Sequence, residues 1–378
     1  MSEDGLPRGP LTGVRVVEFA GIGPGPMAAM LLSDMGAEII RIEPPRRDPQ
    51  IVFDVTLRGR PTLALDLKQG NDVARCLEAL KLADILIEGF RPGVMERLGL
   101  GPEVALQLNP GLIYGRMTGW GQEGPRARDA GHDINYIAMT GALAAMGEAG
   151  HPPMPPLNLV GDFGGGSLYL VFGIVAALYE RERSGLGQMV DAAIVDGTNS
   201  LMAMFQGLAA SIPGVMARER VPLGGVLPNY RCYQCADERY VAVGAMEPHF
   251  HRELLCRLGL DEDLPCTPEQ AAEETTCLER VFATRTRDEW AEWFIGSDAC
   301  VSPVLELHEV PSDPHMAVRS SHVTINGVTH PTPAPRLSRT PGAIQGLDPA
   351  SEEGGEERLA RWRQAGGRDG VASLHMEP

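Results

Sequence analysis

The sequence predicts an α/β protein in which a large domain built on a parallel β-sheet is joined to a smaller α+β domain. The first observation is a β-α-β unit, with an apolar strand at 14–19, a helix at 27–35 and a second strand at 38–43. The second is that short apolar runs and segments of helical spacing keep alternating up to about residue 210. The third is a composition rich in Pro, Gly and Arg at 212–229, where we expect the chain to cross into the second domain.

The remaining elements of the large domain follow from the same two patterns. Short apolar runs bounded by turn residues predict strands, and they lie at 62–68, 84–88, 112–117 and 189–193. Helical spacing of apolar residues predicts helices at 72–82, 167–180 and 196–210, with a helical turn at 94–98. We therefore assign the first part of the large domain to 1–210.

The second half of the chain divides into four further segments. A linker is expected at 211–228 and a small domain at 229–312, with strands at 230–233 and 240–244 and helices at 248–258 and 288–294. Residues 313–350, which include a proline-rich stretch at 331–335, are interpreted as a strap that returns to the large domain. The polar tail at 351–378 is expected to be only partly ordered.

Charge and composition exclude several classes of partner. The 378 residues are 43% apolar and carry a net charge of −17, so nucleic acid and an anionic membrane surface are disfavoured as partners. Seven cysteines form no disulfide framework and predict a reducing, cytoplasmic location. We find no apolar run that predicts a membrane span and no signal-peptide pattern at the start.

Two motifs suggest functions that their details disfavour. The glycines at 21–25 after the first strand, with Glu43 further on, resemble a dinucleotide-binding turn, but Pro24 and Pro26 remove backbone N–H donors that a pyrophosphate would need. Cys232 and Cys235 form a C-x-x-C pair without a second pair at suitable spacing, so no metal is predicted.

Basic residues follow several strand ends. Lys68, Arg91 and Arg97 lie at or just beyond the ends of predicted strands, where ligands collect in open α/β sheets, and Arg46 and Arg47 follow the second strand. Each could be an ordinary solvated side chain, but three at comparable positions in an acidic protein favour a ligand with several phosphoryl groups.

A histidine and an aspartate form the candidate catalytic pair. His132 lies in Gly-His-Asp and Asp162 in Gly-Asp-Phe-Gly, and each is next to a plausible helix start. Together they can move one proton off a carbon and another onto it. The alternatives are a helix-cap neighbour for His132 and an N-cap or turn residue for Asp162. A kinase-like Asp-Phe-Gly motif is disfavoured because no catalytic loop or ATP loop accompanies it.

Six runs of sequence carry a family resemblance, which extends over about residues 11–340. They are VVEFAGIGPGP (16–26), GFRPGVMERL (89–98), GHDINY (131–136), PLNLVGDFGGG (156–166), AVGAMEP (242–248) and DACVSPV (298–304). With them the chain resembles the family III CoA-transferase (CaiB/BaiF) superfamily, and within it the α-methylacyl-CoA racemases. The combination of His132, Asp162 and Glu247 is similar to the racemase branch rather than to the transferases.

The resemblance implies an architecture and a set of site residues. It implies a Rossmann-like large domain, an interlocked homodimer with shared active sites, and a role in lipid metabolism without metal or organic cofactor. His132 and Asp162 would be the acid/base pair, with Glu247 orienting His132, Asn158 beside Asp162, and the amide of Asp133 donating to the thioester oxygen. The residues implied to bind coenzyme A, which is part of the substrate, are Lys68, Arg91, Arg97, Gly131, Ile134, Asn135, Tyr136, Arg46 and Ile22.

The expected reaction inverts the C2 centre of a 2-methyl-branched acyl-CoA thioester through an enolate. Inversion requires a proton to leave one face of C2 while another arrives on the opposite face, and two bases on opposite faces are the simplest arrangement. A CoA-transferase with Asp162 as nucleophile is the first alternative, and a non-catalytic acyl-CoA-binding protein is the second. The run LGGVLPNY at 223–230 departs from the pattern of the racemases, which leaves the acyl specificity open.

Overall fold

The structure is a computed structural model that describes residues 9–45, 54–261, 271–346 and 353–366. Contacts within the chain divide it into two compact units. Unit 1 comprises residues 1–140, 157–201 and 320–378, and unit 2 comprises residues 141–156 and 202–319. The segment at 211–228, which we expected to be a linker, therefore belongs to unit 2, together with part of the expected strap.

Unit 1 contains a six-stranded parallel sheet in the order β3-β2-β1-β4-β5-β6. Its strands are β1 (Arg15–Phe19), β2 (Glu38–Glu43), β3 (Thr62–Ala64), β4 (Ile85–Glu88), β5 (Ile113–Thr118) and β6 (Met189–Ala193). This order is that of the Rossmann fold, whose ligands bind where the strand order reverses, here between β1 and β4. The predicted α/β class with a parallel-sheet domain is confirmed.

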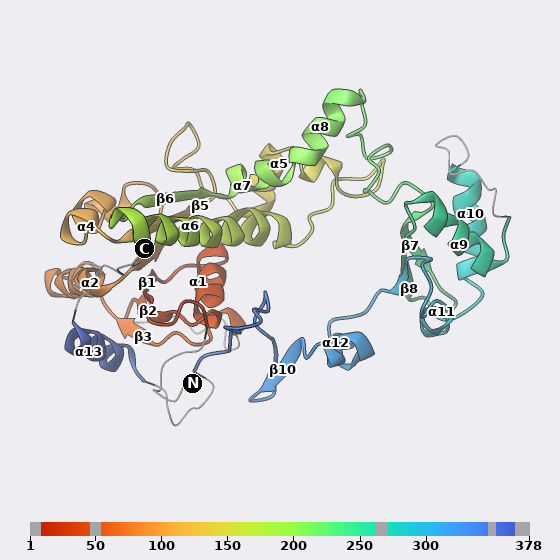
Figure 1. Ribbon diagram of the computed structural model, residues 1–378. Coiled ribbons are helices and arrows are strands. Elements are labelled where there is room, and N and C mark those ends of the chain that lie inside the picture. Colours follow the sequence, from red (N-terminus) through yellow and green to blue (C-terminus); the bar gives the residue numbers. More distant parts are fainter. Residues whose placement is uncertain (1–8, 46–53, 262–270, 347–352, 367–378) are drawn as a thin grey trace, which may run out of the picture. The chain divides into compact units, whose positions relative to one another are not determined.

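Helices cover both faces of this sheet (Figure 1). The helical segments of unit 1 are α1 (Pro24–Asp34), η1 (Val55–Leu57), α2 (Gly70–Leu82), α3 (Val94–Arg97), α4 (Pro102–Leu108), α5 (Asp133–Met139), η3 (Leu159–Ser167), α6 (Leu168–Ser184), α7 (Ile194–Leu201) and α13 (Gly355–Ala365). Alternate strand residues point to opposite faces, so Val17 packs with α2, α4 and α13, while Val16 packs with α1 and α6. The unit also holds the hairpin β10 (His322–Ile325) and β11 (Val328–Pro331).

Unit 2 has its own core on a three-stranded antiparallel sheet in the order β7-β8-β9. Its strands are β7 (Tyr230–Gln234), β8 (Tyr240–Gly244) and β9 (Val301–Pro303). Its helical segments are η2 (Leu143–Ala145), α8 (Ala203–Ser211), α9 (Pro248–Leu258), α10 (Ala271–Phe282), α11 (Arg287–Trp293), η4 (Val310–Ser312) and α12 (Pro314–Val318). Tyr233, Phe282 and Trp290 fill the centre of its core.

Several element boundaries differ from those that we predicted. Helix α1 begins at Pro24, since proline is well tolerated in the first turn of a helix. The strand expected at 62–68 ends at Ala64, and the helix expected at 196–210 is two helices, α7 and α8. The polar tail contains the docked helix α13, in which Leu359 and Trp362 are fully buried and the indole N–H of Trp362 donates to Glu38 (3.0 Å).

One helical stretch, Leu159–Ser184, is long and apolar enough to cross a membrane by length and composition. Our expectation that no stretch would qualify is therefore corrected. A core helix of a globular protein meets the same criterion, and Leu170 and Ile174 of this stretch are fully buried in the core against the sheet.

Candidate active site

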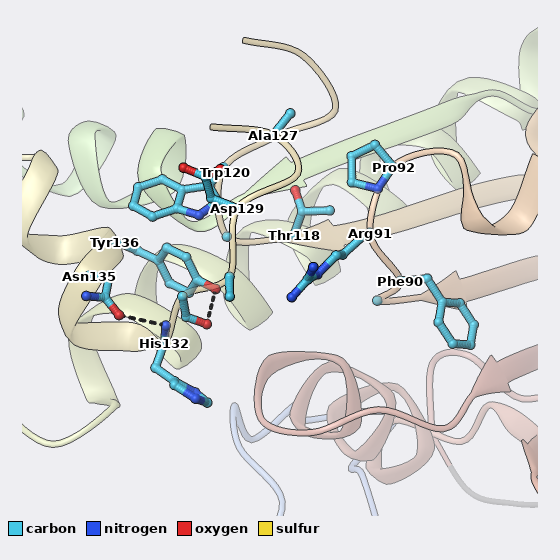
Figure 2. Close-up of a pocket in the computed structure, with 14 residues that line it drawn as sticks. Phe90, Arg91, Pro92, Thr118, Trp120, Ala127, Asp129, His132, Asn135 and Tyr136 are labelled. Carbon is cyan, nitrogen blue, oxygen red and sulfur yellow. Dashed lines mark hydrogen bonds between the residues drawn. The ribbon is translucent and has the colours of Figure 1, made fainter. Parts of the chain in front are cut away.

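The start of helix α5 presents His132. The backbone of His132 is extended, at φ −128° and ψ 173°, so His132 is the N-cap and Asp133 the first helical residue. The side-chain oxygen of Asn135 accepts a hydrogen bond from the backbone N–H of His132 (3.0 Å), which fixes the entry of the chain into the helix (Figure 2). The imidazole of His132 extends away from this turn and is exposed.

Tyr136 fixes the loop before the helix. A Cβ atom at Gly119 would come within 2.1 Å of the ring of Tyr136, and one at Gly131 within 2.7 Å, so both positions require glycine. The hydroxyl of Tyr136 donates to the carbonyl of Gly131 (2.5 Å), and its ring packs edge to face with Trp120 at 4.8 Å between centroids. The segment from Gly119 to His132 is thereby held against α5.

Asp133 connects α5 to the segment that carries Asp162. The Oδ1 atom of buried Asp133 accepts a hydrogen bond from the backbone N–H of Asp162 (2.6 Å). Glycine is needed at 161, because a Cβ atom there would lie 2.2 Å from that same oxygen. The Oδ2 atom of Asp133 is buried without a hydrogen-bond partner among the residues that the structure describes.

Asp162 lies in the π-helical segment η3, which the glycines after it allow to pack closely on α7. A Cβ atom at Gly165 would lie 2.4 Å from Oγ1 of Thr198, and one at Gly197 would lie 1.9 Å from the carbonyl oxygen of Gly165. The helix that the apolar spacing predicts from 167 begins at Leu168, and the π-helical turns before it depart from that prediction. Such turns are rare and frequently occur at functional sites.

The environment of Asp162 favours its protonated form. Burial raises the pKa of the Asp162 carboxyl above its usual range, and the nearby charge of Asp133 raises it further. A side-chain hydrogen bond with Asn158 and the proximity of His132 act in the opposite direction. Because the net pKa shift is upward, Asp162 keeps its proton to a higher pH than an ordinary carboxyl group does.

His132 and Asp162 line the same cleft, of about 410 Å³, at the carboxyl ends of β1, β4 and β5. The loop after β1 forms one wall of the cleft, with Ile22 exposed there. Gly23 in this loop leaves room for Asp162, since a Cβ atom at 23 would lie 3.0 Å from Oδ2 of that carboxyl. The structure thus brings together the two residues that the sequence singled out as a pair.

A second cleft, of about 510 Å³, adjoins the first and shares His132, Gly131 and Tyr136 with it. Figure 2 shows Arg91, which reaches from the loop after β4 across this cleft toward Tyr136. Burial raises the pKa of the Tyr136 hydroxyl, Asp162 adds to this effect, and the positive charge of Arg91 opposes it. Arg91 therefore supplies positive charge close to the candidate pair.

The other predicted site residues lie in different places. Asn135 lines the second cleft and Ile134 is 44% exposed beside it on α5. Arg97 ends α3 with its guanidinium near Gly93, and Lys68 is exposed beyond β3. Neither Arg97 nor Lys68 is among the residues that line the two clefts.

Two further predicted site residues, Arg46 and Glu247, are not among the residues that line these clefts. Arg46, like its alternative Arg47, lies outside the described residues. Glu247 belongs to unit 2, where it is the exposed N-cap of α9. Among the residues that the structure describes, no group of three or more His, Cys, Asp or Glu side chains could hold a metal ion.

Comparison with known proteins connects this geometry to a family. The model of CoA-transferase family III matches residues 11–354. The chain belongs to CoA-transferase family III. It is 43% identical over 373 residues to a protein of Mus musculus named alpha-methylacyl-CoA racemase, covering 97% of this chain and 96% of the relative. A Homo sapiens protein of the same name is 42% identical over 337 residues, covering 88% and 87%.

A solved structure confirms the fold-level relationship of this family III chain. The crystal structure of a CAIB/BAIF family protein from Brucella suis superposes with a TM-score of 0.79 at 26% identity, covering 95% of this chain and 99% of that chain. The family resemblance that the sequence motifs indicated is therefore confirmed.

Glu88 is a residue of the cleft that the sequence analysis missed. It ends β4, its side chain is fully buried, and it lines the same cleft as His132 and Asp162. The available signal was an acid at the end of the otherwise apolar strand Ile-Leu-Ile-Glu, where a charge must have buried partners.

Proposed function

We propose that this protein is a racemase that inverts the C2 centre of 2-methyl-branched acyl-CoA thioesters. The observation that supports this proposal most strongly is the joint position of His132 and Asp162 in one cleft. The names of the mouse and human relatives agree with it. Burial raises the pKa of the Asp162 carboxyl, which favours the protonated form that the reaction requires of one of the two groups.

The proposed mechanism uses the two groups on opposite faces of C2. In one direction the neutral imidazole of His132 removes the C2 proton, and protonated Asp162 delivers a proton to the other face. In the reverse direction ionised Asp162 removes the proton and the imidazolium of His132 delivers one. The enolate oxygen would accept a hydrogen bond from the backbone amide of Asp133, which as the first N–H of α5 has no intrahelical acceptor. One such donor is worth about 2.7–4 kcal/mol elsewhere.

We further propose that the charged part of coenzyme A binds along the loop after β4. Arg91 projects into the cleft that adjoins His132, and a guanidinium matches phosphate oxygens in geometry and charge. Arg97 lies beyond β4 and Lys68 beyond β3, and Arg46 or Arg47 would contribute from beyond β2. The chemistry is proton transfer between side chains and carbon, so it needs no metal or organic cofactor.

Unit 2 contains a cleft of its own. Met146, Met202 and Met216 line an apolar cleft of about 260 Å³, together with Leu223 and Gly224 of the loop whose sequence departs from the racemase pattern. Methionine adapts to varied apolar shapes. We therefore propose that this loop contributes to the choice of acyl chain.

The alternative is a CoA-transferase in which Asp162 attacks the thioester carbonyl and forms an acyl anhydride. Some relatives of this chain are named as CoA-transferases, and these names are the reason to consider this alternative. It assigns no task to His132. A nucleophilic carboxylate must also be ionised, and the raised pKa of Asp162 disfavours the ionised form.

One experiment separates the two functions. The protein is incubated in deuterated water with a 2-methylacyl-CoA of single configuration and a free carboxylic acid. We expect deuterium at C2 together with loss of optical purity, measured by mass spectrometry and chiral chromatography. Transfer of CoA to the free acid without deuterium at C2 would instead establish the transferase, and neither change would indicate a binding protein.

We propose in addition that two copies of the chain associate, and that Glu247 of one copy orients the imidazole of His132 in the other. A row of exposed apolar side chains on α6 supports an interface. Phe172 is 72% and Tyr179 is 69% exposed, and Leu168 and Val175 lie on the same helical face.

The oligomeric state tests this association. We expect light scattering to give the mass of a dimer for the wild type and a dissociated chain for Phe172→Glu, because a charge cannot be buried without a partner. The matched control is Val104→Glu, which places the same charge at an exposed apolar position on α4, away from α6, and should stay dimeric. A monomeric wild type with full activity would contradict the proposal.

A further inference from the structure

The loop that carries Arg91 begins at a buried glutamate. Glu88 is the last residue of β4, and its side chain is fully buried. Its Oε2 atom accepts a hydrogen bond from the backbone N–H of Phe90 (2.7 Å), and its Oε1 atom accepts one from Nε of Arg116 (2.9 Å). Each carboxylate oxygen therefore faces a donor, and the first of these donors belongs to the loop itself.

The same arginine also holds the far end of the loop. Arg116 lies in β5 with its side chain 6% exposed, and its NH1 group donates to Oε1 of Glu96 (2.8 Å). Glu96 is in α3, the short helix that follows the loop. One guanidinium thus bridges the residue before the loop and the helix after it. Between the two lie Gly89, Phe90, Arg91, Pro92 and Gly93.

Phe90 holds one side of the loop, because its ring packs on the core and edge to face with Phe19 at 6.2 Å between centroids. Arg91 itself is exposed, so packing in the core does not fix its position. A freely moving Arg91 would lose conformational freedom on binding a phosphate, and this loss weakens binding. A loop that is already fixed avoids that cost.

We propose that Glu88, Arg116 and Glu96 form a staple that positions the loop 89–93, and with it Arg91, for binding the phosphate-bearing part of the substrate. The inference rests on the proposed function in its assignment of that ligand. The three side chains are positioning residues, because they act on the ligand through Arg91 and the loop. Their effect belongs to substrate binding rather than to the proton transfers.

The protonation of Glu88 controls whether the staple is complete. Burial raises the pKa of Glu88 to about 7; the Phe90 amide and Arg116 oppose this shift, and Glu96 adds to it. Tyr114 of β5 also lies near Glu88, and burial raises the pKa of its hydroxyl. His132 and Asp162 face Glu88 across the cleft that the three residues line. A protonated Glu88 would aim an O–H at one of its two donors, so the staple is complete above about pH 7 and weakens as the pH falls through that value.

The effect of Glu88 on stability has the opposite sign. Because its pKa in the folded state is raised, the folded chain binds the proton more tightly than the unfolded chain does. The contribution of this group to stability is therefore full below its ordinary pKa and is lost as the pH rises toward about 7. The ionised form that completes the staple is thus the less stable one.

The test uses Glu88→Gln, which keeps the shape of the side chain. The amide N–H₂ replaces one of the two oxygens that accept hydrogen bonds, so one of these bonds is lost. We expect KM for the acyl-CoA to rise about tenfold, as for loss of a hydrogen bond to a charged group, with kcat changed by less than about twofold. The rise in wild-type KM on going below about pH 7 should be absent in this variant. The matched control is Glu103→Gln on α4, an exposed acid that should behave as the wild type.

Two measurements keep the test decisive. Hydrogen exchange of the backbone amides at 89, 90, 91 and 93 needs no substrate, and we expect it to be faster in Glu88→Gln than in Glu103→Gln. If Glu88→Gln does not fold, Glu96→Gln decides, since Glu96 is partly exposed and acts through the same Arg116. Unchanged exchange together with an unchanged KM in an active enzyme would overturn the staple. A wild type that lacks racemisation but shows faster exchange in the variant would refute the proposed function and leave the staple standing.

Discussion

Replacing Asp162 by Asn is expected to slow the inversion at C2 by about 10²–10⁴-fold, the usual effect of removing a positioned acid or base. The amide has nearly the shape of the carboxyl and can keep the contact with Asn158, but it can neither deliver nor accept a proton. The measurement is the loss of optical rotation of a single enantiomer of a 2-methylacyl-CoA, with KM determined alongside. Because the change leaves the cleft intact, we expect KM to change much less than kcat.

The control for this variant is Asp196→Asn. Asp196 is exposed on α7, the helix that packs on η3, so its substitution removes the same charge without touching the cleft. It should retain the wild-type rate. Inversion at the wild-type rate in Asp162→Asn would exclude this carboxyl from the reaction.

Replacing His132 by Asn should have an effect of similar size, about 10²–10⁴-fold on kcat. Asparagine keeps a polar side chain at the N-cap of α5 and is well tolerated there. The helix start should therefore remain, and so should the hydrogen bond that the backbone N–H of residue 132 donates to the side-chain oxygen of Asn135. What is lost is the imidazole that the proposed mechanism uses as the base in one direction and as the acid in the other. Racemisation kinetics and thermal unfolding of the same sample separate loss of catalysis from loss of folding.

His315→Asn is the matched control for this substitution, because His315 is exposed on α12 in unit 2. It should be fully active. A transferase that uses Asp162 as nucleophile would lose CoA transfer in Asp162→Asn but keep most of it in His132→Asn. Full retention of CoA transfer in His132→Asn would therefore favour the alternative function.

The parallel sheet could be predicted because its strands are short, apolar and separated by turn residues. β2 is buried at every position, and its run of isoleucines on both faces is typical of a central parallel strand. The π-helical segment η3 could not be predicted in this way, since it depends on the close approach of Gly165 to α7, which is a tertiary contact. The position of α13 likewise depends on a tertiary contact, the packing of Trp362 against the sheet. The polar sequence around Trp362 gives no indication of this contact.

The pair His132 and Asp162 could be proposed from glycine-flanked polar residues at helix starts, and the structure places both in one cleft. The role of the Asp133 carboxylate in holding the Asp162 segment could not be predicted, because it accepts a hydrogen bond from a backbone amide 29 positions away in the sequence. Glu88 was missed for the same reason: its partner Arg116 lies on the neighbouring strand, and only the register of β4 and β5 brings the two together.

The central claim is that two acid/base groups act on opposite faces of C2. The most direct test measures deuterium exchange at C2 in deuterated water, for each enantiomer separately, with Asp162→Asn and with His132→Asn. Asp162→Asn should still exchange the C2 hydrogen of the enantiomer whose hydrogen faces His132, with retention of configuration. His132→Asn should exchange that of the other enantiomer through Asp162. Exchange of the same enantiomer by both variants would place the two groups on one face and contradict the mechanism.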